Sequence, residues 1–82
     1  MQQNYMQTIK GTVSKIKVLK LSMSPLVRFS LDGVSCLIAT HSLNFLYDVT
    51  EGSEVVIGGE YNSRKQFVVK KYCVLSKIKS FM

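Results

Sequence analysis

The order of the strand-like segments constrains this chain more than any single residue does. Apolar and polar residues alternate in five segments, over 8–19, 26–31, 34–39, 55–61 and 67–75. A period of two residues is typical of β-strands. Turn residues separate these segments, except that the third gap, 41–52, reads as a short helix. Three strands, a helix and two strands predict a small all-β barrel.

This order of elements is that of the OB-fold, a five-stranded Greek-key barrel, here with one short helix between its third and fourth strands. We expect a single domain over residues 1–82, with the barrel over about 6–75 and a short basic tail over 76–82. A chain of this length has room for one core. OB barrels are used above all to hold single-stranded nucleic acid, so this fold also suggests a ligand class.

The long first segment must change its facing to serve both halves of a barrel. Ile9 and Val13 share one face, whereas Ile16 and Val18 have the opposite parity. A bulge near residues 14–15 would place both pairs inside.

Three further local features are expected from turn and capping chemistry. Asp32–Gly33 predicts a tight hairpin, and Gly58–Gly59 predicts a bulge or a sharp bend in the fourth strand. The short helix has Ser42 as its expected N-cap, with Leu43 and Phe45 available, beside Leu46, to plug the barrel end.

Charge is segregated along the chain. Residues 1–31 carry five basic side chains and no acid, residues 32–60 carry five acids and no Lys or Arg, and residues 61–82 carry six basic side chains and no acid. The net charge of +6 therefore arises because the basic side chains of the two ends outnumber the acids of the middle. This pattern predicts a polyanionic partner.

Several runs resemble a known family. Ile9–Ile16, Val27–Gly33 and Val34–Ala39 resemble the start of the tRNA-anticodon-type OB domains, and the Phe-x-Leu-x-Gly step is similar to the N-terminal OB domain of the exonuclease VII large subunit. Glu51–Gly59 resembles that family's Glu-Gly-Asp-x-Val-x-Val-x-Gly strand start. The resemblance covers about residues 8–75. It implies an OB-fold that holds single-stranded DNA, tRNA, other RNA or protein.

OB barrels usually hold their ligand across the outer face of the second and third strands, between the first loop and the last hairpin loop. Arginine offers a planar fork for phosphate or base, and lysines neutralise phosphates. Applied to this chain, the rule and its extension along the fifth strand give eight candidate nucleic-acid-binding residues: Lys15, Lys17, Lys20, Arg28, Arg64, Lys65, Lys70 and Lys71.

Aromatic side chains are missing where tight single-strand binders usually have them. The outward positions of the second and third strands carry Arg28, Ser30, Ser35, Leu37 and Ala39. The candidate stacking residues therefore come from elsewhere in the chain: Tyr5, Tyr47, Tyr61 and Tyr72.

No catalytic, metal or cofactor site is expected. The lone His41 has no adjacent nucleophile, no Walker-type phosphate loop is present, and two cysteines with one histidine are too few for a closed zinc site. Cys36 and Cys73 are read as free thiols, although neighbouring third and fifth strands would also permit a disulfide. With neither a secretory signal nor an apolar run of membrane length, a cytoplasmic, non-enzymatic protein is expected.

Two functions stay open at this point. The first is a small single-stranded-DNA-binding protein in DNA replication, recombination or transfer, with RNA as an alternative ligand. The second is an accessory subunit that docks on a larger polymerase, helicase or nuclease through outward apolar residues. The candidates for such contacts are Leu37, Val56, Val68, Phe81 and Met82. Edge pairing through the first or fifth strand would also allow a homo-oligomer.

Overall fold

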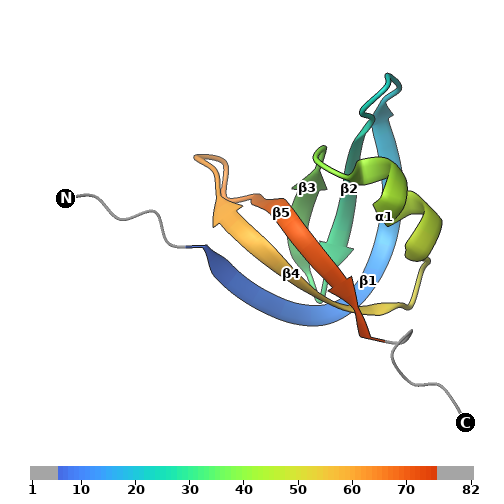
Figure 1. Ribbon diagram of the computed structural model, residues 1–82. Helices are drawn as coiled ribbons and strands as arrows, with labels where there is room; N and C mark the ends of the chain where they lie inside the picture. Colours follow the sequence, from blue (N-terminus) through green and yellow to red (C-terminus); the bar gives the residue numbers. More distant parts are fainter. Residues whose placement is uncertain (1–5, 76–82) are drawn as a thin grey trace, which may run out of the picture.

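Five strands and one helix make up the computed structural model, which describes residues 6–75 (Figure 1). In chain order they are β1 (Gln7–Lys20), β2 (Leu26–Leu31), β3 (Val34–Ile38), α1 (Ser42–Asp48), β4 (Glu54–Tyr61) and β5 (Phe67–Val74). The strands close into a barrel in the order β1-β2-β3-β5-β4, with β4 returning to β1. This is a small all-β, OB-like barrel with its helix between β3 and β4, and the predicted fold class is confirmed.

Closure depends on β1 serving two neighbours. Its first part, residues 7–12, pairs antiparallel with β4, and its second part, residues 13–20, pairs antiparallel with β2. β3 and β5 pair in parallel, starting at Cys36 opposite Phe67. Figure 1 shows β1 as a long curved strand that runs under the barrel and then up its side.

The predicted bulge in β1 lies where one pairing gives way to the other. The register shifts after Ser14, and Lys15 has the left-handed φ of 55°. The Glu51 carboxylate accepts the N–H groups of Lys15 and Ile16, each at 2.8 Å. Two backbone bonds between Val13 and residues 52–53, at 2.7 and 2.8 Å, hold the same loop against β1. The bend is therefore fixed from outside by the loop after α1.

The bulge is predicted to place Ile16 and Val18 inside the barrel, and the structure packs only Ile16 against the core. Val18 pairs with the buried Val27, and so has the predicted facing, but it remains 39% exposed. The reason is that the end of β1 and the start of β2 form a ribbon that projects beyond the barrel (Figure 1).

Among residues 6–75, the core contains thirteen buried apolar side chains from all five strands, from α1 and from its C-terminal flank. They are Val13, Val27, Phe29, Leu31, Cys36, Ile38, Phe45, Val49, Val55, Ile57, Phe67, Val69 and Val74. Phe45 plugs the barrel end as predicted, with its ring stacked on that of Phe29 at 4.6 Å. Leu46 packs at the margin of this core, whereas Leu43, the third residue expected to plug the barrel, is 59% exposed.

The start of α1 differs from the prediction. His41 is the N-cap, with a left-handed φ of 61°, and no side chain caps the helix. Ser42 is instead the first helical residue and is buried. The left-handed turn at His41 begins the helix one residue earlier, so Ser42 lies within the first helical turn and its hydroxyl caps no backbone N–H group.

Both glycine signals are confirmed. Asp32 and Gly33 have φ values of 49° and 89°, as a hairpin turn of the primed type requires. At Gly58–Gly59 the register with β5 shifts and leaves Lys70 as an extra residue. A Cβ atom on Gly59 would overlap the carbonyl of Val68, so the close approach of the two strands at this bulge requires glycine.

The two cysteines are free thiols on opposite sides of the barrel wall. Cys36 is buried, and this burial raises its pKa to about 12, whereas Cys73 is exposed. The disulfide that the neighbouring strands would have permitted does not form.

Replacing Glu51 tests whether its carboxylate holds the β1 bulge. Glu51→Ala leaves the N–H groups of Lys15 and Ile16 without their protein acceptor, and we expect the free energy of unfolding to fall by about 1–2 kcal/mol. Urea denaturation measures the change. Glu54→Ala is the matched control because it removes the same charge from an exposed position nearby. Equal effects of the two substitutions would contradict the role assigned to Glu51.

Candidate nucleic-acid interface

Three of the predicted cations meet on the outer face of β1 and β2. Lys17 lies directly opposite Arg28, and Arg28 lies directly opposite Leu37 on β3. Lys20 lies opposite Leu26, which has the same facing as Arg28 on β2. Lys17, Lys20 and Arg28 therefore form one group, called here the β1–β2 cationic group.

Toward β2 and β3, the immediate neighbours of this group are uncharged. Ser14 pairs with Ser30, and Ser30 pairs with Ser35, in the next row of the same face. In the row of Arg28 itself, the first acid is Glu60, reached across Leu37 and Val68. Three strand spacings separate Arg28 from Glu60, which is about 14 Å. At the β1 margin the Glu51 carboxylate accepts the N–H of Ile16, the residue before Lys17, so the carboxylate-free part of this face is the part over β2 and β3.

The other predicted margin, the β4–β5 turn (residues 62–66), lies at the opposite end of β3. Because β5 runs parallel to β3 from the Cys36–Phe67 pair, the residues before Phe67 lie beside the start of β3. The β1–β2 loop (residues 21–25) lies beside its end, since Val27 pairs with Ile38. The two loops therefore bound the β2–β3 face, as the OB rule requires.

The β4–β5 turn is held rigidly by its first residue. The Asn62 side-chain oxygen accepts the N–H groups of Arg64 and Gln66, each at 2.9 Å. Lys65 completes the turn with a left-handed φ of 65°. Arg64 and Lys65 are both exposed, so a fixed turn presents both cations to solvent.

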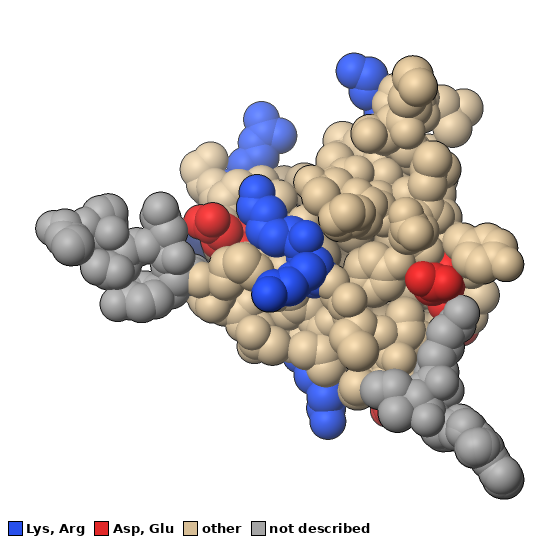
Figure 2. Space-filling model, viewed as in Figure 1, with Lys and Arg blue, Asp and Glu red and all other residues tan. Residues whose placement is uncertain are grey.

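The remaining predicted cations lie elsewhere. Lys70 and Lys71 are exposed on β5, and Lys71 lines a pocket of about 150 Å³ with residues of β1, β4 and β5. Figure 2 shows basic side chains in the middle of the viewed face, over β5, and others toward the two loops. Lys15 occupies the β1 bulge, where its backbone contacts the Glu51 carboxylate. The eight predicted residues therefore do not form one patch.

The four tyrosines differ in their availability for base stacking. Tyr5 lies outside the described residues. Tyr47 is 87% exposed on α1, and Tyr61 is 44% exposed with its ring edge-on to Phe67 at 5.1 Å. Tyr72 is engaged in the structure: its ring packs edge-on to Phe45 and its hydroxyl donates to Asp48 at 3.0 Å. Tyr47 is the most accessible platform of the three that are described.

Sequence reasoning missed an apolar surface beside the cations. Leu21 and Met23 of the β1–β2 loop are 85% and 92% exposed, and Leu43 is exposed on α1. Loops are normally polar, so two large apolar residues alternating with serines in a short loop were a readable signal. By contrast, three residues that were expected to be exposed are half-buried: Leu37, Val56 and Val68. The other two candidates, Phe81 and Met82, lie outside the described residues.

The described residues offer neither a metal-binding cluster nor a membrane-spanning helix. Within residues 6–75, no group of three His, Cys, Asp or Glu side chains is placed to hold a metal ion. No helix within this range is long and apolar enough to cross a membrane. No protein-family model, curated protein or solved structure matches the chain significantly. The resemblance to anticodon-type OB domains stays a prediction.

Tyr72 gives a pH-dependent test of the contact between β5 and α1. Burial, with the Asp48 carboxylate second, raises the pKa of Tyr72 from 10.0 to about 12. The fold favours the protonated phenol, so its contribution to stability is complete below pH 10 and is lost as pH rises toward 12. Tyr72→Phe is expected to cost about 1 kcal/mol at pH 8 and distinctly less at pH 11.5, measured by urea denaturation. A difference between wild type and variant that does not change with pH would contradict this assignment.

Lys65 allows charge and backbone strain to be separated. Lys65→Gly removes the charge and also relieves the left-handed strain, so we expect stability to rise by about 0.5–1 kcal/mol in thermal or urea unfolding. Lys65→Gln removes the same charge and keeps the strain, so it should leave stability nearly unchanged. Equal stabilities for the two variants would show that the turn imposes no strain at this residue.

Proposed function

We propose that this protein is a non-catalytic single-strand nucleic-acid-binding domain that takes single-stranded DNA with little sequence preference. The observation that carries the proposal is the β1–β2 cationic group: Lys17 and Arg28 side by side, with Lys20 one row away, on the ligand face of an OB-like barrel. A role in DNA replication, recombination or transfer follows, because these processes expose single strands. Two free thiols fit the reducing cytoplasm.

Binding would rest mainly on the phosphate backbone. Lys17 and Lys20 would neutralise phosphates as point charges, and Arg28 would bind a phosphate bidentately or stack on a base. Leu37, beside Arg28, offers a half-buried apolar surface to a sugar or a base face. Without an aromatic platform on β2 or β3, the affinity is expected to be modest and strongly dependent on salt.

Arg64 and Lys65 would hold the strand at the opposite end of the face. Together with the β1–β2 cationic group they make five cations. Each neutralised phosphate of a single strand contributes about 0.7 to the slope of log affinity against log salt, so full engagement predicts a slope of about −3.5. The proposal names DNA as the ligand. It assigns no residue of the described face to the 2′-hydroxyl group that distinguishes RNA from DNA.

The β1–β2 cationic group is tested by a charge-matched pair of triple variants. In Lys17→Gln/Lys20→Gln/Arg28→Gln, we expect weaker binding to a fluorescent single-stranded DNA and a salt slope that is shallower by about 2. Fluorescence anisotropy at several salt concentrations measures both. Lys10→Gln/Lys70→Gln/Lys71→Gln removes the same charge from β1 and β5 and should retain the wild-type slope. A larger loss in this control would move the interface to the β5 side of the barrel.

A second function is favoured by one observation, the exposed apolar surface of Leu21, Met23, Leu43 and Tyr47. Large apolar patches on a small domain often mark protein interfaces. The domain would then be an accessory subunit of a polymerase, helicase or nuclease. Wild-type protein that binds neither DNA nor RNA at low salt would contradict the first proposal and favour this one.

A further inference from the structure

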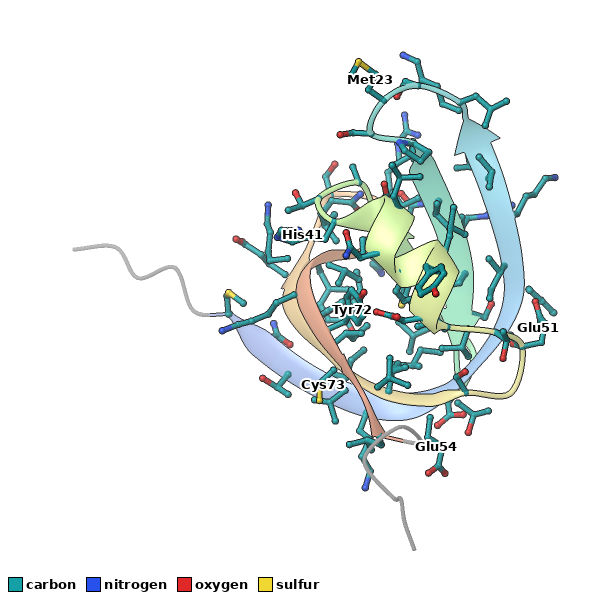
Figure 3. The ribbon with its side chains drawn as sticks, turned by 45° about the vertical axis from the view of Figure 1, so that its right-hand side comes forward. Met23, His41, Glu51, Glu54, Tyr72 and Cys73 are labelled. Atoms are coloured by element: carbon teal, nitrogen blue, oxygen red, sulfur yellow. The ribbon has the colours of Figure 1, made fainter. Side chains whose placement is uncertain are left out.

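A pocket of about 160 Å³ lies where the β1–β2 loop meets the start of α1. It is lined by Met23, Ser24, His41, Ser42, Leu43 and Asn44. Figure 3 shows Met23 at the tip of the loop, above the end of the helix that begins after His41. The pocket adjoins the end of the β2–β3 face, because β2 begins directly after the loop and α1 follows closely on β3. It is separate from the cationic residues assigned above.

One buried polar atom of the lining lacks a partner. Ser42 is only 1% exposed, and its hydroxyl has no hydrogen-bond partner among the described residues. A buried hydroxyl without a partner is costly, and such groups in folded proteins usually mark a water or a ligand. Ser42 is one of the residues that line the pocket, so its unpaired hydroxyl lies at the wall of this site.

The other lining groups indicate the chemistry of that ligand. Ser24, Ser42 and Asn44 provide neutral donors and acceptors, His41 adds an imidazole, and the described lining contains no Lys, Arg, Asp or Glu. A phosphate would find neither a lysine nor an arginine there. Met23 and Leu43 are 92% and 59% exposed and add apolar surface on two sides. A flat ligand with an apolar face and a donor–acceptor edge fits this combination.

We infer that this pocket accepts one unstacked nucleobase of the bound single strand. The inference rests on the proposed function and adds a base-binding pocket to a face that binds mainly the phosphate backbone. Lys20 at the end of β1 lies next to the loop and would hold the adjoining phosphate. The base face would lie against Met23 and Leu43, and its edge would meet the Ser42 hydroxyl and the Asn44 amide, a side chain suited to bidentate base contacts. The pocket thus supplies an enclosed base contact beside β2 and β3, which carry no outward aromatic platform.

The experiment combines loss of a base with changes in the pocket. A single-stranded DNA is first shortened to the least length that keeps full affinity, so that its position on the protein is fixed. An abasic site is then placed at each position in turn, and binding is measured by anisotropy. For wild-type protein, one position should cost about three- to tenfold in affinity, the value of one or two hydrogen bonds and an apolar contact.

We expect Met23→Ala and Ser42→Ala each to lower the affinity for the intact strand by about threefold or more. The affinity of either variant should not fall further when the strand carries the abasic site at that position. Leu21→Ala is the matched control, because Leu21 is as exposed as Met23 on the same loop and does not line the pocket. It should bind both strands as wild type does. Urea denaturation should show Ser42→Ala as stable as wild type, because the hydroxyl that is lost had no partner.

Two other results separate the pocket from the proposed function. If the strand binds and loses affinity in the Lys17→Gln/Lys20→Gln/Arg28→Gln variant, while the abasic series and the pocket variants show no change, the pocket holds only water and the inference is overturned. If wild-type protein binds no strand even at low salt, the proposed function is overturned and the nucleobase pocket with it.

Discussion

The double hydrogen bond from Glu51 to the bulge in β1 is the interaction on which the barrel depends. A strand of fourteen residues can serve two neighbours only if its facing changes once along its length. The left-handed residue Lys15 makes that change, and the Glu51 carboxylate accepts the two N–H groups exposed by it. Without this bend, the buried residues before and after the bulge would face opposite sides of the sheet.

The same bend sets the position of the candidate interface. Beyond the bulge, β1 leaves β4 and continues with β2 as a ribbon that projects from the barrel (Figure 1). Lys17 and Lys20 lie on this ribbon beside Arg28, and its loop carries Met23 to the pocket at the start of α1. A structural carboxylate outside the face therefore positions both the cations and the apolar tip, although it contacts neither.

Local signals predicted most of the fold, because short-range physics decides those features. The primed turn at Asp32–Gly33 and the bulge at Gly58–Gly59 follow from conformations that few other residues tolerate. The expectation for Leu43 as a core residue was wrong, because the buried side of α1 carries Ser42 and Phe45 and Leu43 lies off that side. The expectation for Ser42 as a cap was wrong, because the left-handed turn at His41 begins the helix one residue earlier. That shift depends on how the chain leaves β3, which no local pattern encodes.

The sequence by itself determined the order of the elements along the chain, most of the inward residues of the strands and the concentration of positive charge in the two ends of the chain. Only the tertiary structure decided which cations are neighbours: Lys17 and Arg28 meet through strand register, whereas Lys71 lies on β5, opposite Gly58 of β4. It also decided that Met23 shares a pocket with Ser42. Periodicity depends on contacts between near residues, whereas a surface site depends on register and closure, which bring distant segments together.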